Sequence, residues 1–409
     1  MSANAAALPL RFAHHPWRYA DTGGTRDLRI DFMRGLVFVL LFTTHFRYQS
    51  WFALVAWERI GVVSSAETFI ILAGVVTGAV YGKKLKSEGL GPCSIKLFRR
   101  AWTLYKLAVI VAGSIALLRL APGLDTSALT GFTDPASGQR YELYPPVENG
   151  VLTFFEVLLL KAVPDQFQVV GLYVVLFLLT PLIFAAIHRG RTGSLLVLSW
   201  AVYLINYLAL ESESGTAELR ITGAQFEYAF PLLAWQLIFV HGIVAGYHKH
   251  AIVQFFRTAA GRVALALCIL MSILFAAFSL NHPLPSLPDW AVASFIAPDT
   301  FMQWYRGFFL KYNLGPGRLL NNLVLLISLF ALLTVTWRPV ERWLGWLFIP
   351  LGQESMYVFF MHIYLILLIS NTPLPAMNDV WVNTAIHAGM LLTCWAMVKA
   401  RFLFRWIPR

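Results

Sequence analysis

The chain has 409 residues, of which 58% are hydrophobic and 13% are charged, whereas a typical soluble domain has about 25% charged residues. So few charges cannot cover a globular surface in water, which argues against a soluble enzyme and a disordered protein. The net charge of +11 does not indicate a nucleic-acid binder, because the basic residues lie in short loops between apolar runs, as expected of a membrane protein.

Apolar runs long enough to cross a membrane, about 20 residues, recur along the chain and predict ten transmembrane helices. They cover residues 32–50, 66–82, 101–121, 169–187, 194–210, 230–247, 261–280, 318–336, 351–370 and 380–398. The apolar stretch 151–163 is too short to span and predicts an interfacial or re-entrant helix, or alternatively an ordinary loop helix.

The predicted fold class is therefore an all-α polytopic membrane protein. Residues 1–30 are expected to form a cytoplasmic N-terminal segment, residues 31–400 a single ten-helix domain, and residues 401–409 a cytoplasmic tail. No cleavable signal peptide is expected, because residues 1–30 are polar and basic.

The charged residues divide unequally between the two sets of loops. With the N-terminus on the cytoplasmic side, the inner loops hold 22 Lys and Arg against 5 Asp and Glu, and the outer loops hold 9 against 15. Since cytoplasmic loops are enriched in Lys and Arg, this split predicts that both termini face the cytoplasm. The long outer loops, 122–168, 211–229 and 281–317, contain Gly, Pro and aromatic residues that indicate folded surface.

The three cysteines, Cys93, Cys268 and Cys394, lie far apart and form no CxxC pattern. The sequence therefore predicts neither a disulfide framework nor a metal site.

Ionisable residues within predicted spans are candidate functional residues, because placing them in a membrane is costly. Arg34 and His45 lie on the first span, eleven residues apart, so they share a helix face and are separated by roughly 16 Å along the axis. Asp31 lies one turn before Arg34 and can pair with it. Alternatively, Asp31 and Arg34 form an anchor at the inner surface, and His45 joins two helices through a hydrogen bond.

Glu67 begins the second span and is expected at a depth similar to that of His45. A carboxylate beside an imidazole can fix its tautomer and raise its basicity, as needed to deprotonate a hydroxyl group. The alternative is a carboxylate that stabilises the start of its own helix. Gly74 and Gly78, further along this span, have the spacing of a close helix–helix contact.

Several other polar residues lie in or near the predicted spans. Gln236, His241, Ser355, His362 and His387 are each compatible with a structural hydrogen bond, and His362 best matches the expected depth of His45. Lys311 and Arg318 lie in the outer segment 306–318 and are cations on an otherwise acidic outer face. They can bind an anionic group or lie at the membrane surface beside Trp304 and Tyr305.

The residues 31–36, Asp-Phe-Met-Arg-Gly-Leu, followed by His45, resemble the first helix of OpgC-type glucan succinyltransferases. Further similar stretches follow in order: Glu67-Thr68-Phe69 with Ala73-Gly74, Ala234-Trp235-Gln236 with Phe239 and Gly242, Gly315-Pro316 with Arg318, and Leu351-Gly352-Gln353-Glu354-Ser355 with Tyr357 and His362. The resemblance extends from about residue 26 to 400. The family belongs to a wider group of membrane acyltransferases that includes the acyltransferase 3 enzymes and heparan-glucosaminide N-acetyltransferase.

The resemblance implies transfer of an acyl group, succinyl in the family, from cytoplasmic acyl-CoA to a periplasmic glucan across the bacterial inner membrane. Acyl-CoA is then a co-substrate and no permanently bound cofactor is expected. The expected partners are the glucan, the lipid bilayer and, in a homodimer, a second copy of the chain. The phosphates of CoA are expected near Arg34, Lys83, Lys84, Arg99 and Arg100.

In this hypothesis His45, oriented by Glu67, deprotonates the glucan hydroxyl. Asp31, Gln236, Lys311, Arg318, Ser355 and His362 are expected to contribute to substrate binding. A covalent acyl-histidine is an alternative mechanism.

A proton-coupled carrier or glycan exporter is an alternative function, because Arg, His and Glu also serve proton relays. The sequence lacks the inverted repeats that are typical of such carriers. A scaffolding protein does not explain ionisable groups on two adjacent helices.

Overall fold

The computed structural model describes residues 17–19, 26–46, 48–133, 139–211, 220–282, 288–374 and 379–407. Parts of the predicted N-terminal segment, of the three outer loops and of the C-terminal tail lie outside these residues. The described chain is mostly helical, and it has one two-stranded antiparallel sheet formed by β1 (Gly131–Thr133) and β2 (Arg140–Glu142).

The long helices are α1 (Leu28–His45), α3 (Ser65–Glu88), α4 (Leu90–Leu118), α7 (Val169–His188), α8 (Thr192–Glu211), α9 (Leu232–Tyr247), α11 (Ala259–Ser279), α13 (Pro316–Val335), α14 (Trp337–Gln353), α15 (Ser355–Ser370) and α16 (Val380–Lys399). The shorter ones are η1 (Trp51–Val55), α2 (Trp57–Ile60), α5 (Ser127–Thr130), α6 (Gly150–Leu158), η2 (Asp165–Phe167), η3 (Gln225–Tyr228), α10 (Lys249–Phe255), η4 (Asp289–Ala291) and α12 (Pro298–Phe308).

Each of the ten predicted spans overlaps a helix, but not every helix is long and apolar enough to cross a membrane. Seven of the described helices meet both conditions, or eight spans result if the pair α14 and α15, bent by 89°, counts as one. The predicted run 351–370 crosses this bend, which lies at Glu354. The structure therefore supports an all-α, multi-pass membrane protein, and the count of ten remains a prediction.

Helix α14 was missed by the sequence analysis because it is amphipathic rather than uniformly apolar. Its first two turns contain Arg338, Glu341 and Arg342, and its buried residues include Phe348 and Leu351. An apolar stripe with charges on the other face is typical of a helix that lies against a protein or at an interface. The bend after α14 then lets α15 enter the bundle.

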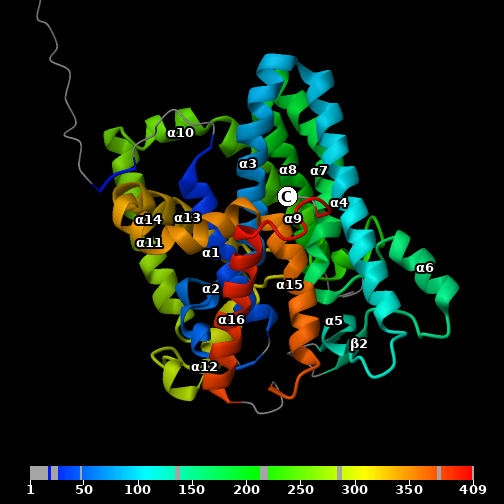
Figure 1. Cartoon of the computed structure of the whole chain (residues 1–409). Coiled ribbons are helices and arrows are strands. Elements are labelled where there is room, and N and C mark those ends of the chain that lie inside the picture. Colours follow the sequence, from blue (N-terminus) through cyan, green and yellow to red (C-terminus); the bar gives the residue numbers. More distant parts are fainter. Residues whose placement is uncertain are drawn as a thin grey trace, which may run out of the picture.

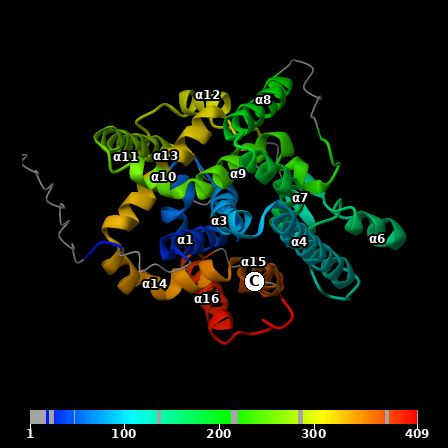
Figure 2. The same cartoon turned by 90° about the horizontal axis from the view of Figure 1, so that it is seen from above.

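Helix α1 occupies the centre of the molecule. Viewed from above, α1 and α3 lie inside a ring formed by α4, α7, α9, α13, α14, α15 and α16 (Figure 2). We call the end of the bundle with the α3–α4 turn, at the top of Figure 1, the inner end, and the opposite end, with α5, β2 and α12, the outer end. Helix α1 runs toward the outer end. These names follow the predicted topology.

Glycines permit two very close helix crossings. Gly35 on α1 and Gly352 on α14 face each other's backbone, since a Cβ at Gly352 would lie 1.8 Å from the Asp31 carbonyl oxygen. On α3 and α9 the pairs Gly74/Gly78 and Gly242/Gly246 face each other in the same way, which confirms the packing predicted for α3. The close approach of α14 to α1 places the bend before α15 beside the inner end of α1.

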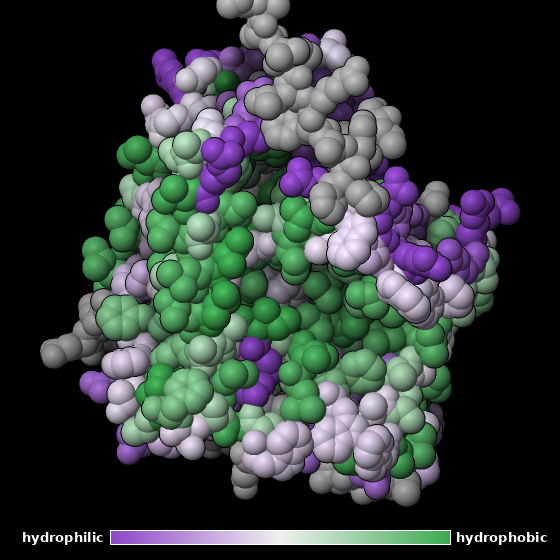
Figure 3. Space-filling model, turned by 90° about the vertical axis from the view of Figure 1, so that its left-hand side faces the viewer, coloured by the Kyte–Doolittle hydropathy of each residue, from purple (hydrophilic) through white to green (hydrophobic). Residues whose placement is uncertain are grey.

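The surface carries the apolar band expected of a membrane protein. Figure 3 shows apolar side chains across the middle of one face, with hydrophilic residues gathered mainly above them. On α11 the exposed residues include Val263, Leu267, Leu270, Ile273 and Leu274. Such a large exposed apolar surface is stable only in contact with lipid or another apolar partner.

Candidate active site

Two helices, α1 and α15, place the candidate site residues in matched pairs. From the inner end outward the pairs are Arg34 with Ser355, Phe38 with Phe359, and His45 with His362. The spacing on each helix is close to whole turns, so each set of three side chains lies on one face. We call this line of contacts the α1–α15 seam.

The inner end of the seam is a charged cluster around Arg34. The Arg34 guanidinium donates a hydrogen bond to the Ser355 hydroxyl and lies 3.9 Å from the Asp31 carboxylate. Asp31 also accepts hydrogen bonds from Arg26, at 2.6 and 3.0 Å. The predicted Asp31–Arg34 contact is therefore present, but the closer partner of Asp31 is Arg26, so one carboxylate is shared by two guanidinium groups and the three side chains carry a net positive charge.

Two further residues lie near enough to Arg34 to interact electrostatically with it, Tyr173 and Arg100. Tyr173 is buried, and its hydroxyl has no hydrogen-bond partner among the described residues. A buried hydroxyl without a partner costs free energy, so this group is a ready donor for a ligand that reaches Arg34.

The middle of the seam is closed by aromatic rings. Phe359 stacks on Phe69 and Phe167, with ring centroids 5.8 and 5.2 Å apart, and Phe38 packs edge-on against Phe69 at 5.2 Å. Phe38, Phe167 and Phe359 are almost completely buried. These rings separate the charged cluster at the inner end from the histidine pair at the outer end.

The outer end of the seam is a pair of histidines. The rings of His45 and His362 have their centroids 5.2 Å apart and 27° between their planes, and His45 Nδ1 lies 3.0 Å from His362 Nε2. His362 is completely buried, and its Nδ1 lies 2.6 Å from the Phe359 carbonyl oxygen. His45 is half-buried, which leaves it within reach of a ligand.

This arrangement fixes the protonation pattern when both rings are neutral. A carbonyl oxygen only accepts, so His362 Nδ1 carries the proton and His362 Nε2 is an acceptor. His45 Nδ1 must then donate to His362 Nε2, and the lone pair of His45 lies on Nε2. A histidine held in one tautomer with its outer nitrogen basic is the arrangement of a general base or a nucleophile.

The structure corrects the expected partner of Glu67. Its carboxylate accepts hydrogen bonds from the Ser64 backbone at 2.6 Å and from the Ser64 hydroxyl, and it pairs with Arg318 at 2.5 Å. Glu67 therefore forms the capping box of α3, and the side chain that orients His45 is His362. Spacing alone could not show this, because it gives the depth of Glu67 but not the direction in which its side chain points.

Arg318 is buried rather than placed at an outer entrance. Its guanidinium also donates to the Phe309 carbonyl at 2.8 Å and approaches the Tyr305 hydroxyl at 3.4 Å. Lys311, in contrast, is exposed, with its ammonium group 5.8 Å from the centre of the Phe230 ring. Of the two cations expected to bind an anion at the outer end, only Lys311 faces the surface.

Three other polar residues form structural contacts. Gln236 joins α8 and α9 through hydrogen bonds with the Ser199 hydroxyl and carbonyl, and His241 bonds the Leu237 carbonyl on its own helix. His387 lies between the Ser50 hydroxyl and the Phe42 carbonyl and holds α16 against α1. These hydrogen bonds involve none of the residues that form the α1–α15 seam.

The basic residues predicted to bind CoA lie around the α3–α4 turn at the inner end. Lys83 and Arg99 are exposed, whereas Lys84 and Arg100 are half-buried, and the Lys84 ammonium lies 4.9 Å from the centre of the Tyr81 ring. Among the described residues, no group of three or more His, Cys, Asp or Glu side chains could hold a metal ion.

A small pocket opens beside His45 at the outer end. It has a volume of about 220 Å³ and is lined by side chains from the end of α1, from α5 to β2, from η2 and from the end of α15. The lining includes Tyr48, whose pKa is raised by burial and by the nearby Asp125, so the phenol stays protonated and can donate a hydrogen bond.

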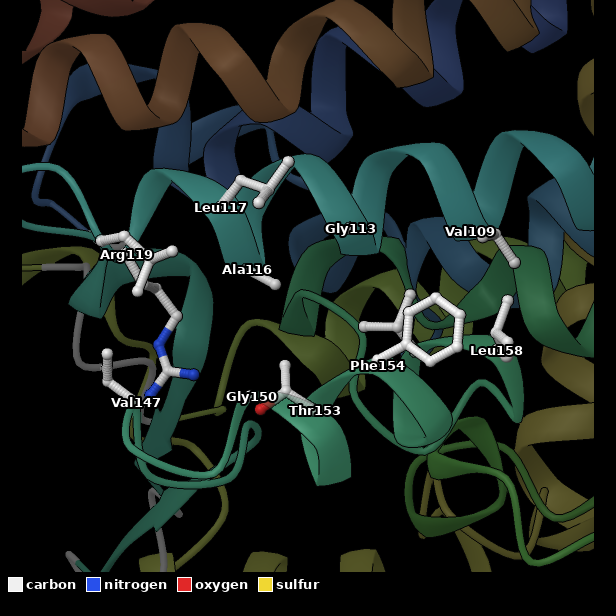
Figure 4. Close-up of a pocket in the computed structure, with 12 residues that line it drawn as sticks. Val109, Gly113, Ala116, Leu117, Arg119, Val147, Gly150, Thr153, Phe154 and Leu158 are labelled. Carbon is white, nitrogen blue, oxygen red and sulfur yellow. The ribbon is translucent and has the colours of Figure 1, made fainter.

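A larger hollow of about 410 Å³ lies between α4 and α6. Figure 4 shows its apolar lining, with Arg119 at one end and Leu158 at the other. Helix α6 corresponds to the predicted short apolar helix. None of the described residues that line the hollow is a histidine or has a carboxylate, so this lining lacks the acid–base groups that the seam provides.

A family model described as OpgC protein matches residues 26–406, nearly the whole chain. The chain belongs to the OpgC family. Membership implies a glucan-modifying, acyltransferase-like role and confirms the resemblance inferred from the sequence. Neither the curated proteins nor the solved structures contain a match to this chain. In this OpgC family member, the seam unites Arg34, Ser355, His45 and His362, which the sequence analysis had named separately.

The sequence analysis missed three features of the site. Tyr173, near Arg34, and Gln166, which lines the pocket beside His45, are uncharged and lie near the start of an apolar run, where polar residues are common. Their only sequence signal is that position. The aromatic rings in the seam were not identified because phenylalanines are frequent throughout the chain.

Proposed function

We propose that the protein is a bacterial inner-membrane O-acyltransferase that moves an acyl group, succinyl as the first candidate, from cytoplasmic acyl-CoA to hydroxyls of osmoregulated periplasmic glucan. The observation that carries the proposal is the α1–α15 seam, with a charged cluster at one end and an oriented histidine beside a pocket at the other. Family membership supports the glucan and the transferase class.

On the donor side, the CoA phosphates bind at the inner end, near Arg34 and the basic residues of the α3–α4 turn. Arginine suits this task because its planar guanidinium hydrogen-bonds phosphate oxygens. The roughly 16 Å between Arg34 and His45 along α1 lets the extended arm of CoA carry the thioester to His45. This path requires the rings of Phe38 and Phe359 to move aside.

On the acceptor side, His45 Nε2 takes the proton of a glucan hydroxyl as its oxygen attacks the thioester carbonyl. The carbon–sulfur bond then breaks, an ester forms on the glucan, and the CoA thiolate leaves with the proton from His45. His362 keeps His45 in the required tautomer and stabilises the imidazolium through its Nε2 lone pair. The same lone pair on His45 would attack the thioester directly in the acyl-histidine alternative.

The test uses purified full-length protein, unsubstituted glucan, and either succinyl-CoA or acetyl-CoA. We expect CoA release that depends on glucan, together with acylated glucan detected by mass spectrometry. His45→Ala should reduce this activity about 10²–10⁴-fold while melting temperature and CoA binding stay unchanged. His241→Ala, on α9 and outside the seam, is the matched control and should remain active.

Two outcomes would contradict the proposal. A well-folded His45→Ala protein with wild-type activity would remove His45 from the chemistry. Glucan transport by proteoliposomes, with no acyl transfer from any CoA thioester, would favour the transporter alternative.

A further inference from the structure

The pocket beside His45 combines aromatic rings with polar side chains. Its lining residues include Phe46 and Tyr48, whose rings pack edge-to-face at 5.1 Å, and the polar residues Ser127, Thr133, Arg140, Gln166 and Ser370. At about 220 Å³ it is smaller than the roughly 300–1,000 Å³ that encloses a drug-sized ligand. A single sugar ring fits this size, and a longer oligosaccharide must extend outside.

Gln166 provides an acceptor that the protein itself does not use. The side chain is 5% exposed, and its Nε2 donates to the Ala128 carbonyl at 2.9 Å. This bond fixes the orientation of the amide, because a carbonyl cannot accept from Oε1. Oε1 has no hydrogen-bond partner among the described residues. A buried acceptor without a partner is costly, and a ligand hydroxyl in the pocket would satisfy it.

The rest of the lining suits a neutral polyhydroxylated ligand. Arg140 is held by the Glu142 carboxylate at 2.8 Å, so its positive charge is largely compensated. Asp125 accepts a hydrogen bond from Ser127 of the lining, which lowers the pKa of Asp125 and keeps it a carboxylate, and this charge also offsets that of Arg140. An anionic acceptor would be repelled by this carboxylate, whereas sugar hydroxyls can bond to Gln166, Tyr48 and Arg140.

We propose that this pocket binds one glucosyl ring of the acceptor, with one sugar hydroxyl donating to Gln166 Oε1 and another held against His45 Nε2. This inference rests on the proposed function, and it specifies the part of the substrate that is recognised and the residues that recognise it. The remainder of the glucan lies outside, over β1 and β2.

The experiment compares three variants of the full-length protein. Gln166→Met keeps the length of the side chain but removes the acceptor, and Thr133→Trp fills the pocket from an exposed position. Gln254→Met is the control, because Gln254 is exposed on α10 and does not line the pocket. Each protein is assayed for the KM of unsubstituted glucan and of acyl-CoA, and for binding of unsubstituted glucan without any CoA thioester.

We expect Gln166→Met to raise the KM for glucan roughly two- to tenfold, as for one lost hydrogen bond, and to leave the KM for acyl-CoA unchanged. Thr133→Trp should abolish glucan binding, and Gln254→Met should behave like the wild type. Unchanged glucan KM in both pocket variants, or no glucan binding by the wild type, would overturn the inference. Glucan binding that Thr133→Trp abolishes, without any acyl transfer, would support the pocket and refute the proposed reaction.

Discussion

His362 has no direct contact with solvent, yet its position decides which nitrogen of His45 is basic. Its own Nδ1 is committed to the Phe359 carbonyl, so its Nε2 can only accept from His45. A buried neutral imidazole is a less costly partner in this position than a carboxylate, because it adds no charge to the interior. The site thus obtains an oriented base without a buried anion beside it.

The first prediction concerns this pair. His362→Leu should lower kcat about 10²-fold or more, since wrong tautomers of a catalytic histidine are poorly active, with little change in the KM for acyl-CoA. His362→Gln offers an amide oxygen to His45 and should restore part of the rate. Steady-state kinetics of both variants, with melting temperatures, check this. Equal rates in the two variants would mean that His362 only fills space.

The geometry of the ion pair between Glu67 and Arg318 indicates that it stabilises the fold and does not take part in the reaction. Both side chains are buried, and their hydrogen bonds run to each other, to Ser64 before α3 and to Tyr305 and Phe309 at the end of α12. The second prediction is that Arg318→Ala lowers the free energy of unfolding by about 3–5 kcal/mol, because it leaves a buried carboxylate unpaired. Thermal denaturation in detergent measures the loss.

The double variant Glu67→Gln with Arg318→Met should recover a large part of that stability, since no buried charge remains. Glu67→Gln alone should keep the wild-type pH dependence of acyl transfer. A shifted pH profile in a stable Glu67→Gln protein would instead restore Glu67 to the catalytic role expected from sequence.

Sequence reasoning named the four polar residues of the α1–α15 seam, Arg34, His45, Ser355 and His362, but not which of them pair. Arg34 and His45 could be placed on one face because both lie on a single helix with a known repeat. Ser355 and His362 lie more than 300 residues away, so their pairing depends on how α14 and α15 pack against α1. That packing is set by Gly35 and Gly352, and one sequence contains no pattern that matches these two glycines to each other.

At the scale of elements, the closest packing joins α3 to α9. The third prediction is that Gly78→Ala destabilises the protein by about 1–3 kcal/mol or more, because its Cβ would lie 2.0 Å from the Ile243 carbonyl oxygen and force the helices apart. Gly389→Ala on α16 is the control, since its Cβ would have nothing within 4 Å. It should change stability by at most about 1 kcal/mol.

Melting temperatures of the two variants in detergent make this comparison. Equal stability would show that α3 and α9 are further apart than the structure places them.

The existence of these helices was predictable from apolar runs, but the residues at which they end were less predictable. Helix α3 continues to Glu88 and α4 begins at Leu90, because a single glycine with φ of +83° at position 89 turns the chain, whereas a longer loop was expected there.

At the scale of the whole molecule, the distribution of charge and the position of the site indicate the same orientation in the membrane. The basic residues Lys83, Lys86 and Arg99 are exposed at the end of the bundle where Arg34 lies. The pocket beside His45 opens at the opposite end, among α5, β2 and η2. If the positive-inside rule holds, the donor end faces the cytoplasm and the acceptor end faces the periplasm, as the proposed reaction requires.

The last prediction tests this orientation in cells. In a background with Cys93, Cys268 and Cys394 replaced by alanine, a new cysteine at Gly91, which is exposed at the α3–α4 turn, should resist a membrane-impermeant thiol reagent until the inner membrane is opened. A cysteine at Glu148, exposed before α6, should react in spheroplasts with an intact inner membrane. Labelling of both positions under the same condition would place the two ends of the seam on one side. The thioester and the glucan would then have to approach His45 from the same compartment, and the transfer across the membrane proposed for this protein would be excluded.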